Sequence, residues 1–271
     1  ALCVNEKGIE NYLEGVGKGF KIINNPIPFV TIPTTAGSGA EVTKNAVITS
    51  YPKKYKKSFR DDRLLAKVVI ADPLLTISLP SDETRFGGMD AVCQLIESYT
   101  TKKNNSFCNA LSIYHIPRAI KTIISLMNDP NDIILRTQML EASLSSGITL
   151  ASSGLGAVHG FASGLGGMFN IPHGLICAIL LPHIVRLNST RNSNLYKNIS
   201  LITDGSGDSF KFSHYLYKIN SKLNIPTDFK QFNINKNLSK EIVERSKGGS
   251  MNGNPVDFND EELINFIESI I

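Results

Sequence analysis

The sequence has little cysteine. Its four cysteines, among 271 residues, are Cys3, Cys93, Cys108 and Cys177, and no two of them stand in a CxxC spacing. A disulfide-stapled scaffold or a cysteine-rich zinc motif needs more thiols at closer spacing, so neither is predicted. Cys93 and Cys177 lie in apolar runs and are predicted to be small core residues. Reduced thiols of this kind favour a cytoplasmic protein.

Long apolar runs and a strong excess of one charge are also missing. The longest apolar run, residues 175–181, is too short to cross a bilayer, and no signal-peptide pattern opens the chain. The net charge is +4, and much of the excess comes from the lysines at 53, 54, 56 and 57. We interpret this run as a solvated loop, because nucleic-acid binding needs a larger basic surface with interleaved aromatics. Neither a membrane nor a nucleic acid is predicted as a partner.

Several well-known active-site signatures are absent. No GxSxG nucleophile elbow occurs, so a serine hydrolase has no support. The segment Thr34–Thr43 (TTAGSGAEVT) has Val42 where a GxGxxG fingerprint needs its third glycine, and no lysine stands where a P-loop needs one. This segment is either a plain turn or a turn that offers N–H groups and hydroxyls to a phosphate. The glycines of 15–19 fit neither pattern and predict a flexible loop.

The hydrophobic pattern changes near residue 80. Before it, short segments rich in Val and Ile predict strands at 27–33, 46–49 and 66–71. After it, apolar residues recur at helical spacing, beginning behind the predicted N-cap Ser81. The predicted helices cover 82–102, 106–127 with a kink at Pro117, 132–151, 173–187 and 259–271. The predicted fold class is therefore α/β (partial) plus all-α.

Three polar residues stand out in apolar or glycine-rich surroundings. His159 and His173 are flanked by small residues, and imidazole is a good ligand for zinc or ferrous iron, although hydrogen-bonded core histidines would look the same. Asp90 lies within an apolar helix, where a carboxylate must be paired or must bind a metal. Gln94 is four residues later on the same helix face, so both could offer oxygen to one ion. A capping acid or a buried ion-pair partner remains the alternative for Asp90.

Three long stretches, in this order, and one short segment near the end resemble parts of the iron-containing alcohol dehydrogenase family. The segment 31–49 (TIPTTAGSGAEVTKNAVIT) resembles its threonine–glycine signature, and 72–97 (DPLLTISLPSDETRFGGMDAVCQLIE) resembles its metal-binding helix. The segment 154–183 (GLGAVHGFASGLGGMFNIPHGLICAILLPH) is similar to its double-histidine signature, and 250–255 (SMNGNP) resembles one branch of the family. The resemblance covers nearly the whole chain.

This resemblance implies a fold like that of dehydroquinate synthase, with the active site in a cleft between two domains. Residues 1–80 would be the C-terminal part of an α/β dinucleotide-binding domain, and 81–271 an all-helical metal-binding and catalytic domain. The implied catalytic residues and metal ligands are Asp90, His159 and His173, and a fourth ligand falls at Gln94, where histidine is common in the family. The positions that the resemblance places near the cofactor are Thr34, Thr35, Gly37, Ser38 and Lys56.

The activity that the resemblance implies is hydride transfer between an alcohol, or its aldehyde or ketone, and NAD or NADP, with Fe²⁺ or Zn²⁺ as the metal. A homodimer is compatible with it. A lyase like dehydroquinate synthase and an inactive fragment are the alternatives. The family's glycine-rich phosphate loop has no counterpart here, and Ala1–Val4 resembles the helix that follows it, so the chain is expected to lack the first part of that domain. A second histidine of the signature falls at Ser163.

Overall fold

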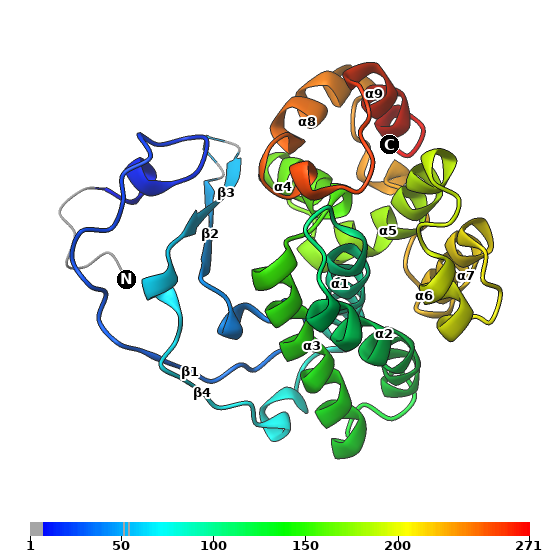
Figure 1. Cartoon of the computed structure of the whole chain (residues 1–271), viewed down its shortest axis with the longest axis horizontal. Coiled ribbons are helices and arrows are strands. Elements are labelled where there is room, and N and C mark those ends of the chain that lie inside the picture. The colour runs from blue at the N-terminus through cyan, green and yellow to red at the C-terminus, as the bar shows by residue number, and fades with distance from the viewer. Residues whose placement is uncertain (1–7, 51, 54) are drawn as a thin grey trace.

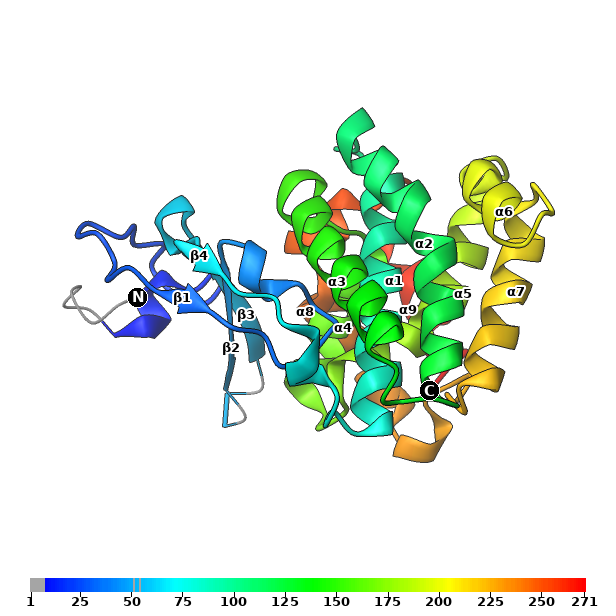
Figure 2. The same cartoon turned by 90° about the horizontal axis from the view of Figure 1, so that it is seen from below.

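The computed structural model of the chain describes residues 8–50, 52–53 and 55–271. The strands gather at one side of the molecule and the long helices at the other, as both views show (Figures 1 and 2). This arrangement confirms the predicted fold class, a partial α/β part followed by a helical part. The domain boundary at residue 80 stays a prediction, and the helix expected at Ala1–Val4 lies outside the described residues.

The strand side contains two small sheets. Strand β1 (Val30–Thr31) pairs in parallel with β4 (Val68–Val69), and β2 (Asn45–Ser50) pairs with β3 (Tyr55–Arg60) in antiparallel register. The strands at 27–33 and 66–71 were therefore placed correctly but are shorter than predicted. Proline lacks the N–H that a sheet ladder needs, and prolines at 28 and 33 bracket β1.

The interpretation of the lysine run as a solvated loop is wrong for its second half. Lys56 and Lys57 lie in β3, between Tyr55 and Phe59, which are both buried. These two aromatic rings join a small core with Tyr12, and this burial holds the segment extended. Lysine side chains conceal the period-two pattern in the sequence, because Lys57 stands between Tyr55 and Phe59 on the face that they bury.

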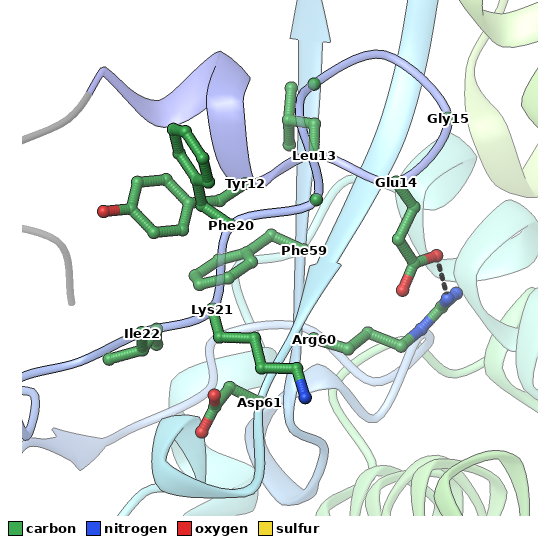
Figure 3. Close-up of a pocket in the computed structure, with 12 residues that line it drawn as sticks. Tyr12, Leu13, Glu14, Gly15, Phe20, Lys21, Ile22, Phe59, Arg60 and Asp61 are labelled. Atoms are coloured by element: carbon green, nitrogen blue, oxygen red, sulfur yellow. Dashed lines mark hydrogen bonds and ion pairs between the residues drawn. The ribbon is translucent and has the colours of Figure 1, made fainter.

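The predicted loop at 15–19 forms one wall of a cavity of about 240 Å³ on the strand side (Figure 3). Tyr12, Phe20 and Phe59 lie at this cavity, and Glu14 forms an ion pair with Arg60 across its rim. None of the predicted site residues lines it.

Helix α1 (Ser81–Thr100) lies at the centre of the helical side. It packs against α2 (Ser106–Leu126), α3 (Ile133–Ser153) and α5 (His173–Arg191), and its residues 88–98 are all buried. The predicted N-cap at Ser81 is wrong: Pro80 takes the extended N-cap conformation, and the Ser81 hydroxyl points to the Met127 sulfur. A helix buried on every face must provide a partner for each polar side chain that it carries.

The remaining helices surround α5 and close the C-terminal end. Helix α4 (Ala157–Met168) follows the glycine-rich turn and packs against α5 and α8. The bounds of the others are α6 (Lys197–Thr203), α7 (Ser209–Lys222), α8 (Ser239–Ser246) and α9 (Asp260–Glu268). Within the described residues, none of the helices combines the length and apolar character needed to cross a membrane.

A close approach of two glycines joins the strand side to the helical side. Gly39 adopts a left-handed conformation with φ of 59°, and its backbone lies against α3 at Gly147. A Cβ atom on Gly147 would stand 2.2 Å from the carbonyl oxygen of Gly39. The segment Thr34–Thr43 can therefore rest on α3 only because both positions lack a side chain.

Gly147→Ala should destabilise the chain by about 1–3 kcal/mol, because the methyl group forces the backbone of Gly39 away from α3. Urea unfolding followed by circular dichroism measures this change. Gly166→Ala is the matched control: its Cβ would meet the nearest atoms at 3.7 Å, so the higher helix propensity of alanine should leave stability equal or improved. Equal stability of the Gly147 variant would contradict the close packing described here.

His183 links α5 to the segment that follows α7. Its Nε2 donates to the Thr227 carbonyl at 2.7 Å, and its Nδ1 lies 2.7 Å from the Tyr217 hydroxyl. Burial lowers the pKa of His183 below its usual value, although the hydrogen bond to Thr227 opposes the shift. The folded chain therefore binds fewer protons than the unfolded chain just below about pH 6.5.

Because the pKa of His183 is lower in the folded chain, its contribution to the free energy of unfolding is complete above about pH 6.5. This contribution is lost as the pH falls through the lowered pKa. His183→Gln should flatten the acid side of the pH dependence of the free energy of unfolding. Urea titrations at a series of pH values test this, with His214→Gln, at an exposed position, as the control that keeps the wild-type profile. An unchanged acid slope in His183→Gln would rule out this linkage.

Candidate metal centre

Three helices bring three of the four predicted ligands together. Asp90 comes from α1, His159 from α4 and His173 from the first turn of α5. The Oδ1 atom of Asp90 lies 3.1 Å from His159 Nε2 and 3.9 Å from His173 Nε2. Asp90 and His159 are buried, whereas 31% of the His173 side chain is exposed. The group therefore combines two buried members with one that faces the outside.

Glu97 fixes the orientation of His159. The N-cap residue of α4 is Gly156, which has no side chain to cap the helix, and the carboxylate of Glu97 takes that place from α1. Glu97 Oε1 accepts from the Val158 N–H at 2.7 Å, and Oε2 lies 2.6 Å from His159 Nδ1. Since an ionised carboxylate only accepts, Nδ1 carries the ring proton and the lone pair on Nε2 points toward Asp90.

Two acceptor atoms that face each other across 3.1 Å require a cation or a proton between them. The Nε2 atom of His173 faces the same Asp90 oxygen at 3.9 Å and adds a third donor atom to the group. Carboxylate oxygen and imidazole nitrogen are suitable donors for iron or zinc, and a carboxylate behind a ligating histidine is a common supporting contact. The residues present therefore fit a divalent metal ion.

The electrostatics of the group also favour positive charge at this place. Burial opposes protonation of His159, but the charge at Cys177 and hydrogen bonds to Asp90, Cys177 and Glu97 outweigh it and raise the pKa of His159 well above its usual value. Burial likewise opposes ionisation of Cys177, but a hydrogen bond from Cys93 and the two imidazoles lower the pKa of the Cys177 thiol. A proton on His159 supplies positive charge beside these acceptors, and a bound dication would supply it in place of that proton.

The exposed edge of His173 borders a cavity of about 330 Å³. The other lining residues come from β2, β3, α4 and the turn before α5: Thr49, Lys56, Gly166, Phe169, Asn170, Ile171 and Pro172. Ser163 on α4 donates to the Lys56 carbonyl at 2.9 Å and so ties β3 to this wall. The cavity gives a small molecule access to the one exposed member of the group.

The predicted cofactor residues fall into two sets. Lys56 lines the cavity beside His173, whereas Thr34, Thr35 and Ser38 are exposed on the segment after β1 and do not line it. Gly37 is buried against α1, where an added Cβ would lie 2.9 Å from the Cα of a helix glycine. The structure thus gives Gly37 a packing role, and the cofactor contacts of all five positions stay predictions.

Gln94 lies beside the group, but its oxygen is turned away from it. Its Oε1 accepts from Ser146 Oγ at 2.8 Å, and its Nε2 stands 3.5 Å from Asp90 Oδ2. In this arrangement Gln94 hydrogen-bonds the Asp90 carboxylate from the side opposite His159. Its role as a metal ligand stays a prediction.

Two members of the site were not predicted. Glu97 lies on the predicted helix, but its function depends on the N-terminus of α4, 61 residues away. Cys177 is buried as expected for a core residue, yet its sulfur lies 3.8 Å from His159 Nε2 and 3.7 Å from His173 Nε2. The sequence signal for Cys177 was its position four residues after His173, which places both on one helix face.

Two overlapping sets of side chains have the composition of a metal site. The first is Asp90, His159, His173 and Cys177, and the second is Cys93, Glu97 and His159. In the second set, Glu97 and His159 approach to 2.6 Å, whereas ligands of one tetrahedral ion lie about 3.3–3.6 Å apart. That contact is a hydrogen bond with no room for an ion, so the first set is the candidate centre.

Comparison with known families gives matches over nearly the whole chain. Residues 84–271 match the C-terminal part of the Fe-containing alcohol dehydrogenase family, and residues 1–73 match iron-containing alcohol dehydrogenase. The chain is 30% identical to 1,3-propanediol dehydrogenase of Citrobacter freundii over 254 residues, which cover 90% of this chain and 66% of that protein. The chain thus spans about two thirds of the length of this relative.

Solved structures agree with the sequence matches. A crystal structure of 1,3-propanediol oxidoreductase superposes with a TM-score of 0.89 at 27% identity, over 99% of this chain and 71% of the other. A sulfoacetaldehyde reductase from Bifidobacterium kashiwanohense, solved in complex with NAD⁺, gives a TM-score of 0.87 at 24% identity, over 99% of this chain and 70% of the other. The second likeness shows the fold alone.

Glu97→Gln should weaken zinc binding by roughly 10–100-fold, because the amide holds the His159 ring less firmly and makes its Nε2 less basic. Competition with a chromophoric chelator measures the affinity. Glu244→Gln, at an exposed position on α8, is the control and should bind zinc as the wild type does. Equal zinc affinities of the wild type, Glu97→Gln and Glu244→Gln would show that Glu97 does not support the metal centre.

Proposed function

Because this chain belongs to the iron-containing alcohol dehydrogenase family, we propose that it transfers a hydride between an alcohol, or its aldehyde or ketone, and NAD or NADP. The observation that carries this proposal is the convergence of Asp90, His159 and His173 beside an open cavity. The chain spans about two thirds of the length of the relatives it matches, and their activity enters here as a proposal for this chain.

In this proposal the chain's own residues bind and orient. Asp90, His159 and His173 hold the ion, and Glu97 keeps His159 in the tautomer that can ligate. When bound, the ion supplies Lewis-acid polarisation of the substrate oxygen, and the nicotinamide supplies the hydride chemistry. The buried side of the group excludes water, and the exposed edge of His173 leaves the approach for the substrate open.

We assign Thr34, Thr35, Gly37, Ser38 and Lys56 to the cofactor side of the site. The position of Lys56 on the cavity wall supports this assignment, because its ammonium group can pair with a phosphate of the dinucleotide near the metal group. The exposed hydroxyls of the segment after β1 can donate to the same ligand.

The alternative function, a lyase like dehydroquinate synthase, would need a more basic cavity. A phosphate-bearing substrate would require several arginines or lysines beside the metal, and apart from His173 the described lining contains the single basic residue Lys56. This composition favours a small neutral alcohol or aldehyde.

We also propose a cytoplasmic location, a homodimer and no nucleic-acid partner. The free buried cysteines support the cytoplasmic location.

His173→Ala should lose the metal and the turnover together. Elemental analysis after anaerobic purification with iron and zinc is expected to give about one equivalent per wild-type chain and almost none in the variant. His214→Ala, at an exposed position on α7, should keep both metal and activity. Normal NAD(P)H-linked turnover by the His173→Ala variant would overturn the proposed mechanism.

A further inference from the structure

We propose that Cys177 is the fourth protein ligand of the metal, in place of Gln94, and that its thiolate makes the centre selective for zinc over ferrous iron. This inference rests on the proposed function, because it concerns the ion that Asp90, His159 and His173 would hold. It adds a ligand that the sequence pattern did not assign.

The sulfur of Cys177 lies close to the ligand nitrogens of both histidines. Cys177 Sγ lies 3.7 Å from His173 Nε2 and 3.8 Å from His159 Nε2, and the ligand atoms of all four residues lie within 4.8 Å of one another. For tetrahedrally placed protein ligands with bonds of about 2.0–2.3 Å, nitrogen and sulfur stand about 3.6 Å apart, and such an ion can expand to five ligands to admit a substrate oxygen. The two distances from the sulfur to the imidazole nitrogens are therefore within a few tenths of an ångström of that geometry.

The backbone places this sulfur without any rearrangement. His173 and Cys177 are separated by four residues on α5, so their side chains leave the same face of the helix one turn apart. Gln94, by contrast, uses its oxygen to accept from Ser146 and turns its amide nitrogen toward Asp90. The sulfur of Cys177 therefore faces the group, whereas the Gln94 oxygen is already bonded to Ser146.

The charges of the ligand atoms also favour Cys177 over Gln94. If Gln94 were the fourth ligand, Asp90 would be the one charged group that touches the ion, because the ionised Glu97 acts through the His159 ring. With the thiolate of Cys177 the four ligands contribute two negative charges and balance the ion.

The ligand set also has a consequence for the choice of metal. A soft thiolate strengthens binding of zinc more than binding of ferrous iron, whereas carboxylate, imidazole and amide ligands discriminate less. We therefore expect the ratio of zinc to iron(II) affinity to be larger in the wild type than in a variant without the thiol.

Cobalt(II) titration of the full chain tests the ligand directly, because a thiolate bound to cobalt gives an intense charge-transfer absorption in the near ultraviolet. The titration is done anaerobically with a phosphine reductant, on the wild type, Cys177→Ser, Cys177→Ala and Gln94→Ala. Cys108→Ala is the control: this cysteine is equally buried but lies on α2, outside both metal-capable groups.

The wild type, Cys108→Ala and Gln94→Ala should show the charge-transfer band. Both Cys177 variants should lack it, bind zinc at least roughly tenfold more weakly and show a smaller ratio of zinc to iron(II) affinity. Circular dichroism of the metal-free proteins establishes that they are folded. A band that persists in Cys177→Ser, or cobalt bound to the wild type without a band, overturns the inference and leaves the proposed function intact.

Two further outcomes separate the two proposals. If Gln94→Ala releases the metal while Cys177→Ser keeps the wild-type affinity, Gln94 is the fourth ligand and the inference is wrong. If the wild type binds neither cobalt nor zinc, the metal centre itself fails, and the proposed function fails with it.

Discussion

The carboxylate of Glu97 is the contact on which the candidate site depends. It accepts the Val158 N–H at the start of α4 and the Nδ1 proton of His159, and so joins α1 to α4 and fixes a ring orientation with one group. The favourable interaction of a carboxylate with a helix N-terminus supports the first contact. Because α4 has glycine at its N-cap, the start of the helix and the direction of His159 are set from another helix.

The second constraint is the burial of α1 on every face. Asp90, Gln94 and Glu97 lie in the buried part of this helix, where an unpaired polar group costs about 1–3 kcal/mol or more. Each has a partner: Gln94 bonds to Ser146, Glu97 bonds to α4, and Asp90 faces two imidazoles. Asp90 accepts from Gln94 on one side and faces His159 and His173 on the other, where we propose that a cation completes the polar stripe of α1.

Much of this organisation could be predicted from the sequence. Apolar periodicity gave the long helices, and the unusual surroundings of Asp90, His159 and His173 marked the three residues that the fold brings together. The strand at Tyr55–Arg60 was missed because lysines mask its alternation. Glu97 and Cys177 were missed because their functions arise from contacts between helices, which periodicity along one helix cannot show.

The central claim is that one divalent ion lies between α1, α4 and α5, and anomalous diffraction tests it most directly. Crystals grown with zinc and iron(II) would be measured on both sides of each metal's absorption edge. The account predicts one strong anomalous peak at about 2.0–2.3 Å from Asp90 Oδ1, His159 Nε2 and His173 Nε2. The absence of a peak there, or a peak bound by Cys93 and Glu97 instead, would contradict it.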